Sequence, residues 1–276
     1  MAGLVPVVDI DRRGFRNAPR ERTDANGAGR RFHLRGPEMP GSGDDRVWGL
    51  SVSVILLVRH GQASFGAADY DVLSPRGLRQ AEVVGASLAA RGVRVDRAVS
   101  GGLVRQRDTA RTVLAAANAG VEVEVDPRWD EYDHTPVYDA FAASVAPELL
   151  ADRAEAARGF QERLEVALLG WSGGARGTGL RPEWSQFSAD VAAATDAVVD
   201  GLGSGATVLV FTSGGVISAV CARLLVLPPA AVVAFNRVTV NAGITKVVHG
   251  RRGNTLVSFN DHAHFEGLHA DLLTYR

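Results

Sequence analysis

The sequence predicts an α/β fold, a three-layer α/β/α sandwich with a mostly parallel central sheet and a helical insertion. From residue 52 onward, short apolar runs alternate with stretches of helical periodicity, which is typical of strand–helix–strand units. The 276 residues are 46% hydrophobic and 22% charged. This balance is that of an ordinary globular protein, and the length suffices for a sizeable core.

The first half of the alternation contains three expected strands and two expected helices. Residues 52–58 form a nearly continuous apolar run, as in a strand that is buried on both faces. Ser74 and Pro75 open a helix that ends near Ala90, because serine caps helix N-termini and proline fits the first turn. The remaining expected elements are strands at residues 95–99 and 121–125 and a helix at residues 103–117.

The middle of the chain, at about residues 133–205, has a different character. Its apolar residues recur at helical spacing without a convincing strand, so we expect an all-helical insertion that forms a cap or side lobe. The alternation then resumes with a strand at 207–211 and a helix at 217–227. Two further strands follow, joined by a Gly-Arg-Arg-Gly turn at residues 250–253.

The N-terminal stretch differs from the rest in composition. Residues 1–47 are rich in Arg, Gly, Pro and Asp and lack a sustained apolar period. We interpret them as disordered, or as sequence upstream of the true start codon, which leaves a domain at residues 48–276.

Charge and cysteine content exclude several classes of function. A formal net charge of -1 argues against a general nucleic-acid binder. No apolar run reaches the ~18 residues that a membrane helix needs. The single cysteine, Cys221, excludes a disulfide framework and favours the cytoplasm. No third metal ligand is evident near His262 and His264, so no metal site is expected. The oligomeric state stays open, a dimer included.

Arg59 and His60 follow the first expected strand directly. Ligands of open α/β sheets bind beyond the carboxyl ends of the strands. A guanidinium group suits phosphate, and a neutral imidazole can accept a phosphoryl group. Gly61 would let a ligand approach the backbone closely. The alternative is an Arg and a His that cap a strand end through backbone hydrogen bonds.

Other candidate residues follow later strands. Arg105 lies in the first turn of a helix, whose free amides attract anions, although it could equally be a solvated arginine. Asp130 and Glu131 follow the third strand, where a carboxylic acid could donate a proton or simply belong to a polar loop. The turn at residues 212–215 contains two glycines whose amides could hold an anion.

Together these features resemble the histidine phosphatase superfamily, also called phosphoglycerate-mutase-like, over about residues 52–276. Residues 59–62 match the R-H-G-[EQ] signature, residues 73–81 match the L-[ST]-x-x-G-x-x-Q-A helix start, and residues 105–110 match R-x-x-x-T-A. Each motif alone is weak, but three in order on the expected elements are specific.

The resemblance implies a phosphomonoester hydrolase that acts on a small-molecule or protein substrate. His60 would attack phosphorus and become transiently phosphorylated, and Glu131 would protonate the leaving alcohol, with Asp130 as the fallback. No metal or other cofactor is implied. The residues expected to bind phosphate are Arg59, Arg105, Gln62 and Ser213.

The sequence departs from the family pattern at two places. Ser213 stands where the family usually carries a second histidine, and loss of a charge-assisted donor costs ~10²–10³ in rate. The protein could therefore be a slow enzyme, a phospho-ligand-binding protein, or an enzyme in which His262 compensates. The loop at residues 62–70 also lacks the asparagine of phosphoglycerate mutases, which disfavours the alternative of a mutase.

Overall fold

The structure is a computed structural model that describes residues 52–64, 71–144 and 153–275. The interpretation of residues 1–47 as disordered or upstream sequence lies outside the described residues. The same holds for most of the loop at residues 62–70, on which the argument against a mutase rests.

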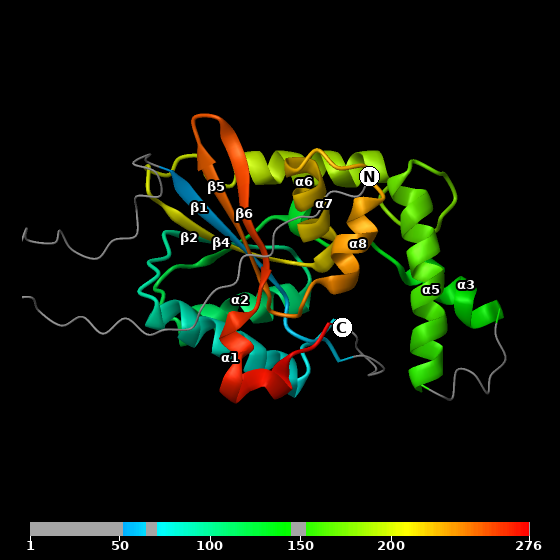
Figure 1. The fold of residues 1–276 in the computed structure, drawn as a ribbon, viewed down its shortest axis with the longest axis horizontal. Coiled ribbons are helices and arrows are strands. Elements are labelled where there is room, and N and C mark those ends of the chain that lie inside the picture. The colour runs from blue at the N-terminus through cyan, green and yellow to red at the C-terminus, as the bar shows by residue number, and fades with distance from the viewer. Residues whose placement is uncertain (1–51, 65–70, 145–152, 276) are drawn as a thin grey trace, which may run out of the picture. The chain divides into compact units, whose positions relative to one another are not determined.

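A six-stranded sheet forms the centre of the fold, in the order β3-β2-β4-β1-β5-β6 (Figure 1). Strands β1 to β4 pair in parallel, and β5 and β6 add an antiparallel hairpin at one edge. The mostly parallel sheet and the expected α/β class are thus confirmed. The strands are β1 (Ser53–Arg59), β2 (Arg97–Ser100), β3 (Val123–Val125), β4 (Thr207–Thr212), β5 (Ile244–Gly250) and β6 (Gly253–Asp261).

Helices cover both faces of the sheet. Leu56 and Val58 of β1 pack among residues of α1 and α2, whereas Ile55 and Leu57 pack among residues of α6 and α7 (Figure 1). The two apolar faces explain the unbroken apolar run in β1. The α-helices are α1 (Pro75–Ala90), α2 (Val104–Ala116), α3 (Thr135–Ser144), α5 (Arg153–Ser172), α6 (Trp184–Ala197), α7 (Gly214–Leu224) and α8 (Ala231–Val238).

Local sequence signals explain where α1 begins. Ser74 is extended at the N-cap, and its Oγ accepts a hydrogen bond from the amide of Gly77 at 3.0 Å. Pro75 occupies the first turn, where its missing N–H leaves no hydrogen bond unmade. Both signals confirm the expected start of this helix.

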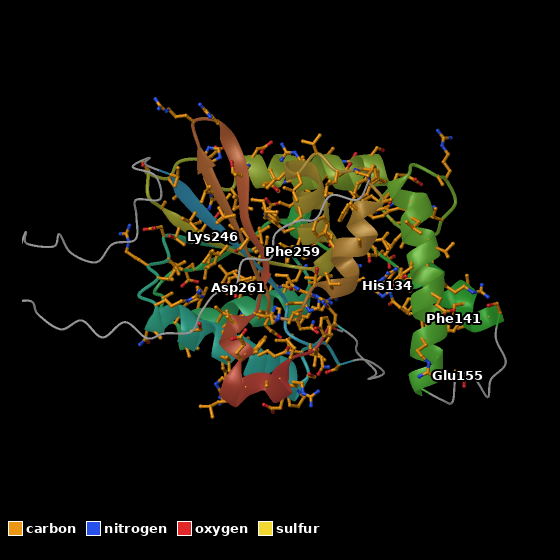
Figure 2. All side chains as sticks on the ribbon, in the orientation of Figure 1. His134, Phe141, Glu155, Lys246, Phe259 and Asp261 are labelled. Carbon is orange, nitrogen blue, oxygen red and sulfur yellow. The ribbon has the colours of Figure 1, made fainter. Side chains whose placement is uncertain are left out.

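The described part of residues 133–205 contains α3, α5 and α6 and no named strand. Figure 2 labels Phe141 where α3 meets α5. The ring centroids of Phe141 and Phe160 lie 6.1 Å apart. Trp171 and Phe187 are buried with their ring centroids 5.1 Å apart. These aromatic side chains therefore build a core, and a role as a cap over the site stays a prediction.

Two elements differ most from the sequence-based expectation, whereas the other expected elements are shifted by no more than two residues at either end. The helix expected at residues 217–227 spans Gly214–Leu224 instead, so the prediction is wrong by three residues at each end. Glycine has a low helix propensity, and the two glycines in the first turn hide the true start. Helix α8 (Ala231–Val238) was not expected. Within the described ranges, no helix combines the length and apolar character needed to cross a membrane.

Candidate active site

The carboxyl ends of β1, β2 and β4 meet at one edge of the sheet and bring the expected residues together. The amide of His60 donates to the carbonyl of Thr212 at 2.8 Å, so the segment after β1 lies beside the end of β4. The amide of Gly101, after β2, donates to the carbonyl of Phe211 at 3.1 Å. Helices α2 and α7 both begin at this edge, and the positive ends of their dipoles make it a favourable place for an anion.

His60 is held in one orientation by two contacts. Its Nδ1 lies 2.7 Å from the carbonyl oxygen of Gly61, and its Nε2 lies 3.3 Å from Nε of Arg105. A carbonyl oxygen only accepts hydrogen bonds, so Nδ1 must carry the ring hydrogen of the neutral imidazole. Nε2 then keeps its lone pair, and that lone pair accepts a hydrogen bond from Arg105.

The surroundings of His60 also keep the ring neutral. The residue is 5% exposed, and burial holds its pKa well below the ordinary value, with the positive charges of Arg105 and Arg59 acting in the same direction. The hydrogen bond to Gly61 opposes this shift. An unprotonated nitrogen at neutral pH is what a nucleophile requires.

Arg105 is buried near the start of α2 and is bound from two sides. Its Nη1 forms an ion pair with Oδ1 of Asp71 at 2.6 Å, while its Nε faces His60. The hydroxyl of Thr109 donates to the carbonyl of Arg105 at 2.7 Å and accepts from the amide of Gly61 at 3.0 Å. The threonine of the R-x-x-x-T-A motif thus joins α2 to the segment that carries His60.

Arg59 is anchored by backbone carbonyl groups. Its Nη1 donates to the carbonyl of Thr239, just after α8, and to that of Tyr275 at 2.7 Å. A Cβ placed on Gly214 would lie 3.5 Å from Nε of Arg59. The guanidinium group therefore lies against the first turn of α7.

The two neighbouring carboxyl groups have different surroundings. Oε2 of Glu131 accepts a hydrogen bond from the amide of Gly215 at 3.2 Å, and its buried Oε1 has no hydrogen-bond partner among the described residues. Burial raises the pKa of Glu131. Oδ1 of Asp130 instead accepts from the amide of Gly102 at 2.5 Å. Burial also raises the pKa of Asp130. Of the two, Glu131 is the one that accepts a hydrogen bond from the first turn of α7.

Ser213 is fully buried at the N-cap position of α7. Its Oγ accepts a hydrogen bond from Nε2 of Gln106 at 2.8 Å, and the same amide donates to the carbonyl of Trp129 at 3.2 Å. The serine hydroxyl makes no capping bond to α7. This position therefore carries an uncharged group, whereas a histidine could carry a charge.

Gln62 and His262 lie in less direct positions. Oε1 of Gln62 accepts from the hydroxyl of Ser74 at 3.1 Å, so this side chain contacts the start of α1. Nδ1 of His262 lies 2.6 Å from the carbonyl oxygen of Asn260. It follows Asp261, labelled in Figure 2 at the end of β6. His262 and His60, both within the described ranges, form no hydrogen bond with each other. Within the described ranges, no three His, Cys, Asp or Glu side chains gather as a metal site.

The sequence did not point to Asp71 or to the carbonyl groups of Thr239 and Tyr275. Asp71 is 34 positions from Arg105 in the chain, and Tyr275 is 216 positions from Arg59. A backbone carbonyl has no residue-type signature. Asp71 could have been noticed only as a carboxylate shortly before the expected helix cap at Ser74.

Comparison with known proteins gives one family and several structures of similar fold. Residues 55–262 match the family model of the histidine phosphatase superfamily (branch 1). A phosphoglycerate mutase from Bacillus anthracis str. Sterne is 21% identical, with 78% of this chain and 96% of that chain covered and a TM-score of 0.53. A mycobacterial glucosyl-3-phosphoglycerate phosphatase is 22% identical, with coverages of 76% and 100% and a TM-score of 0.54.

A phosphoserine phosphatase from Entamoeba histolytica, in complex with 3-phosphoglyceric acid, is 22% identical. There the coverages are 77% and 98%, and the TM-score is 0.53. At these identities the likeness establishes the fold. No curated protein sequence gave a significant match.

Proposed function

The chain belongs to the histidine phosphatase superfamily, branch 1, and on that premise we propose that it hydrolyses phosphomonoesters through a phosphohistidine on His60. The observation that carries the proposal is the orientation of His60. Its Nδ1 contacts Gly61, which leaves the Nε2 lone pair directed at Arg105. A phosphoryl group bound by Arg105 would therefore meet the nucleophilic nitrogen directly.

The first half of the reaction transfers the phosphoryl group to His60. Nε2 attacks phosphorus, the P–N bond forms, and the bond between phosphorus and the ester oxygen breaks. Arg59 and Arg105 bind the phosphoryl oxygens and offset their negative charge in the transition state. Glu131, whose pKa is raised by burial, gives its proton to the leaving oxygen, so that an alcohol departs.

The second half releases inorganic phosphate. The carboxylate of Glu131 takes a proton from water as the water oxygen attacks phosphorus, and the P–N bond breaks. His60 returns to its neutral state with its lone pair on Nε2, and Glu131 is protonated again. The two arginines supply the positive charge, so the scheme requires no cofactor.

A second candidate function is binding of a phosphorylated ligand with little or no turnover. The uncharged, buried hydroxyl of Ser213 favours it, because loss of one charge-assisted donor lowers rates ~10²–10³-fold. The intact set of His60, Arg105 and Glu131 favours hydrolysis. We therefore place the hydrolase first.

The experiment is hydrolysis of p-nitrophenyl phosphate by wild type, His60→Ala and His249→Ala between acid and neutral pH. His249 lies on β5 and contacts Asn254, which makes its variant a matched control. We expect release of nitrophenol by wild type and His249→Ala and none by His60→Ala. Equal hydrolysis by His60→Ala would contradict the proposed nucleophile.

If wild type does not hydrolyse this ester, a hydrolase with a narrow substrate range and a binding protein both remain, and inorganic phosphate tests whether the site binds its anion at all. A bound ligand at 100 times its Kd stabilises a fold by about 2.7 kcal/mol. Phosphate protection of wild type against thermal unfolding, reduced in Arg105→Ala, would support a phosphate site at Arg105, as both candidates require. Absence of both hydrolysis and protection would exclude both candidates.

A further inference from the structure

Asp71 makes three contacts with the beginning of α2. Its Oδ2 accepts a hydrogen bond from the amide of Val104 at 2.8 Å. Its Oδ1 accepts from Nη1 of Arg105 at 2.6 Å and, more weakly, from the amide of Arg105 at 3.5 Å. One carboxylate therefore holds both the helix start and the side chain of its second residue.

These contacts fix the direction of a planar group. The guanidinium of Arg105 contacts Asp71 through Nη1 and His60 through Nε, and two contacts at different nitrogens leave a rigid plane little freedom to rotate. The Arg105 side chain is only 7% exposed, whereas that of Asp71 is 30% exposed. Asp71 is thus the member of the ion pair that reaches toward solvent.

We propose that Asp71 is a positioning residue that holds Arg105 against Nε2 of His60 and so places the arginine for the transferring phosphoryl group. The second part of this statement rests on the proposed function, since it requires that Arg105 bind phosphate. In this scheme Asp71 acts through Arg105 and does not touch the substrate.

A purely structural role makes a different prediction. If Asp71 only caps α2, Asp71→Asn should be harmless, because an asparagine oxygen also accepts a hydrogen bond from a helix amide. If the negative charge is needed to hold Arg105, asparagine should fail even though the protein folds normally. The asparagine variant therefore separates positioning from capping.

Kinetics of Asp71→Asn give the first test, with Asp96→Asn as the matched control. Asp96 accepts a hydrogen bond from the amide of Thr207 at 2.9 Å and pairs with Arg94, at the opposite end of β4. We expect Asp71→Asn to lower kcat/KM about 10- to 100-fold, as for loss of a hydrogen bond between charged groups, with Tm nearly unchanged. Asp96→Asn should keep the wild-type kcat/KM.

A double-mutant cycle with Arg105→Ala decides whether Asp71 acts through the arginine. If it does, Asp71→Asn should change kcat/KM less than about twofold once Arg105 is gone. Equal effects of Asp71→Asn with and without Arg105 would overturn the proposal, as would an Asp71→Asn enzyme with the rate of wild type.

A spectroscopic measurement tests the positioning without any substrate. The Nε–H of Arg105 should give a resolved, slowly exchanging cross-peak in a ¹H–¹⁵N spectrum of wild type, identified by its absence from Arg105→Lys. We expect the peak to broaden or disappear in Asp71→Asn and to remain in Asp96→Asn. An unchanged peak in Asp71→Asn would overturn the proposal. Failure of the proposed function would appear instead as a wild type that neither hydrolyses esters nor binds phosphate.

Discussion

At the scale of single residues, burial favours the neutral forms of both His60 and Glu131. For the imidazole, burial lowers the pKa, and for the carboxyl group it raises the pKa. The proposed first step needs both neutral forms, because a protonated imidazole has no lone pair on Nε2 and an ionised carboxyl group has no proton to give. One physical cause thus prepares both partners of the reaction.

The pH dependence of kcat/KM follows from these two shifts. Activity should rise as the pH increases through the pKa of His60, which lies well below 6.5. It should fall as the pH increases through the pKa of Glu131, which burial raises above 4.5. A pH profile with an alkyl phosphate should therefore show its rising limb displaced to lower pH, and its falling limb displaced to higher pH, than the ordinary pKa values of the two groups would give.

The variants Glu131→Gln and Asp130→Asn show which carboxyl group causes the decrease of kcat/KM at higher pH, the falling limb of the pH profile. Glutamine donates no acid proton, so kcat for an alkyl phosphate should drop about 10²- to 10⁴-fold and the falling limb should vanish. With p-nitrophenyl phosphate, whose leaving group needs less protonation, the drop should be smaller. Loss of the falling limb in Asp130→Asn, with Glu131→Gln unaffected, would assign the proton donor to Asp130.

At the scale of elements, the nucleophile depends on close packing of the segment after β1 against α1. A Cβ placed on Gly61 would lie 2.4 Å from the carbonyl oxygen of Gly77, and one placed on Gly77 would lie 2.2 Å from that of Gln62. The two backbones meet where neither tolerates a side chain. The motif L-[ST]-x-x-G-x-x-Q-A therefore requires glycine at this position, because any side chain there would collide with the backbone of Gln62.

Gly77→Ala should therefore displace the segment that carries His60. Alanine normally stabilises a helix over glycine by roughly 1 kcal/mol, but here the clash is with backbone and cannot be relieved by a rotamer change. We expect a lower Tm and at least about a tenfold loss of kcat/KM, since small misplacements at a reacting centre reduce rates strongly. Gly203→Ala is the control, because a Cβ there meets nothing within 4 Å. An active and more stable Gly77→Ala enzyme would refute the packing argument.

The elements themselves were largely predictable from sequence. Apolar runs and caps place β1, α1 and β4 because those signals are local, and the fold class follows from their alternation. The start of α7 was missed because Gly214 and Gly215 disfavour a helix taken alone, yet the first turn is fully buried there. Helix α8, with eight residues, is too short to show a periodic pattern.

The candidate site was predictable where its residues belong to contiguous motifs or directly follow an expected strand. Arg59, His60 and Arg105 stand in such motifs, and the structure brings them together. The partner of Arg105, Asp71, lies on another part of the chain, and long-range pairing depends on the folded topology. Ser213 was identified as an uncharged substitution, but its bond to Gln106 could not be foreseen.

At the scale of the whole molecule, the segment at residues 272–275 contacts several elements that carry the candidate site. Nε2 of Gln80 on α1 donates to the carbonyl of Leu272 at 2.7 Å and to Oγ1 of Thr274 at 2.8 Å. The amide of Asn241 donates to the carbonyl of Thr274, and its side-chain amide donates to the carbonyl of His60 at 3.3 Å. The C-terminal segment therefore joins α1, the loop before β5 and the segment of the nucleophile.

The same C-terminal region contains a buried histidine that links stability to pH. Burial lowers the pKa of His264 to about 4, and its Nε2 has no hydrogen-bond partner among the described residues. The folded-state pKa lies below the unfolded value of 6.5. His264 thus contributes stability above pH 6.5, and this contribution is lost as the pH falls through about 4. Glu131, with a raised pKa, acts in the opposite sense.

The variant His264→Gln should therefore lose less free energy of unfolding than wild type when the pH is lowered. Glutamine stays neutral at every pH, so the difference in the free energy of unfolding between wild type and variant should shift in favour of the variant from pH 6.5 to pH 4. The upper bound of that shift is about 3 kcal/mol. Urea unfolding at a series of pH values measures it, with His269→Gln as a control from the same region. Parallel pH curves for wild type and His264→Gln would show that the buried imidazole does not limit stability in acid.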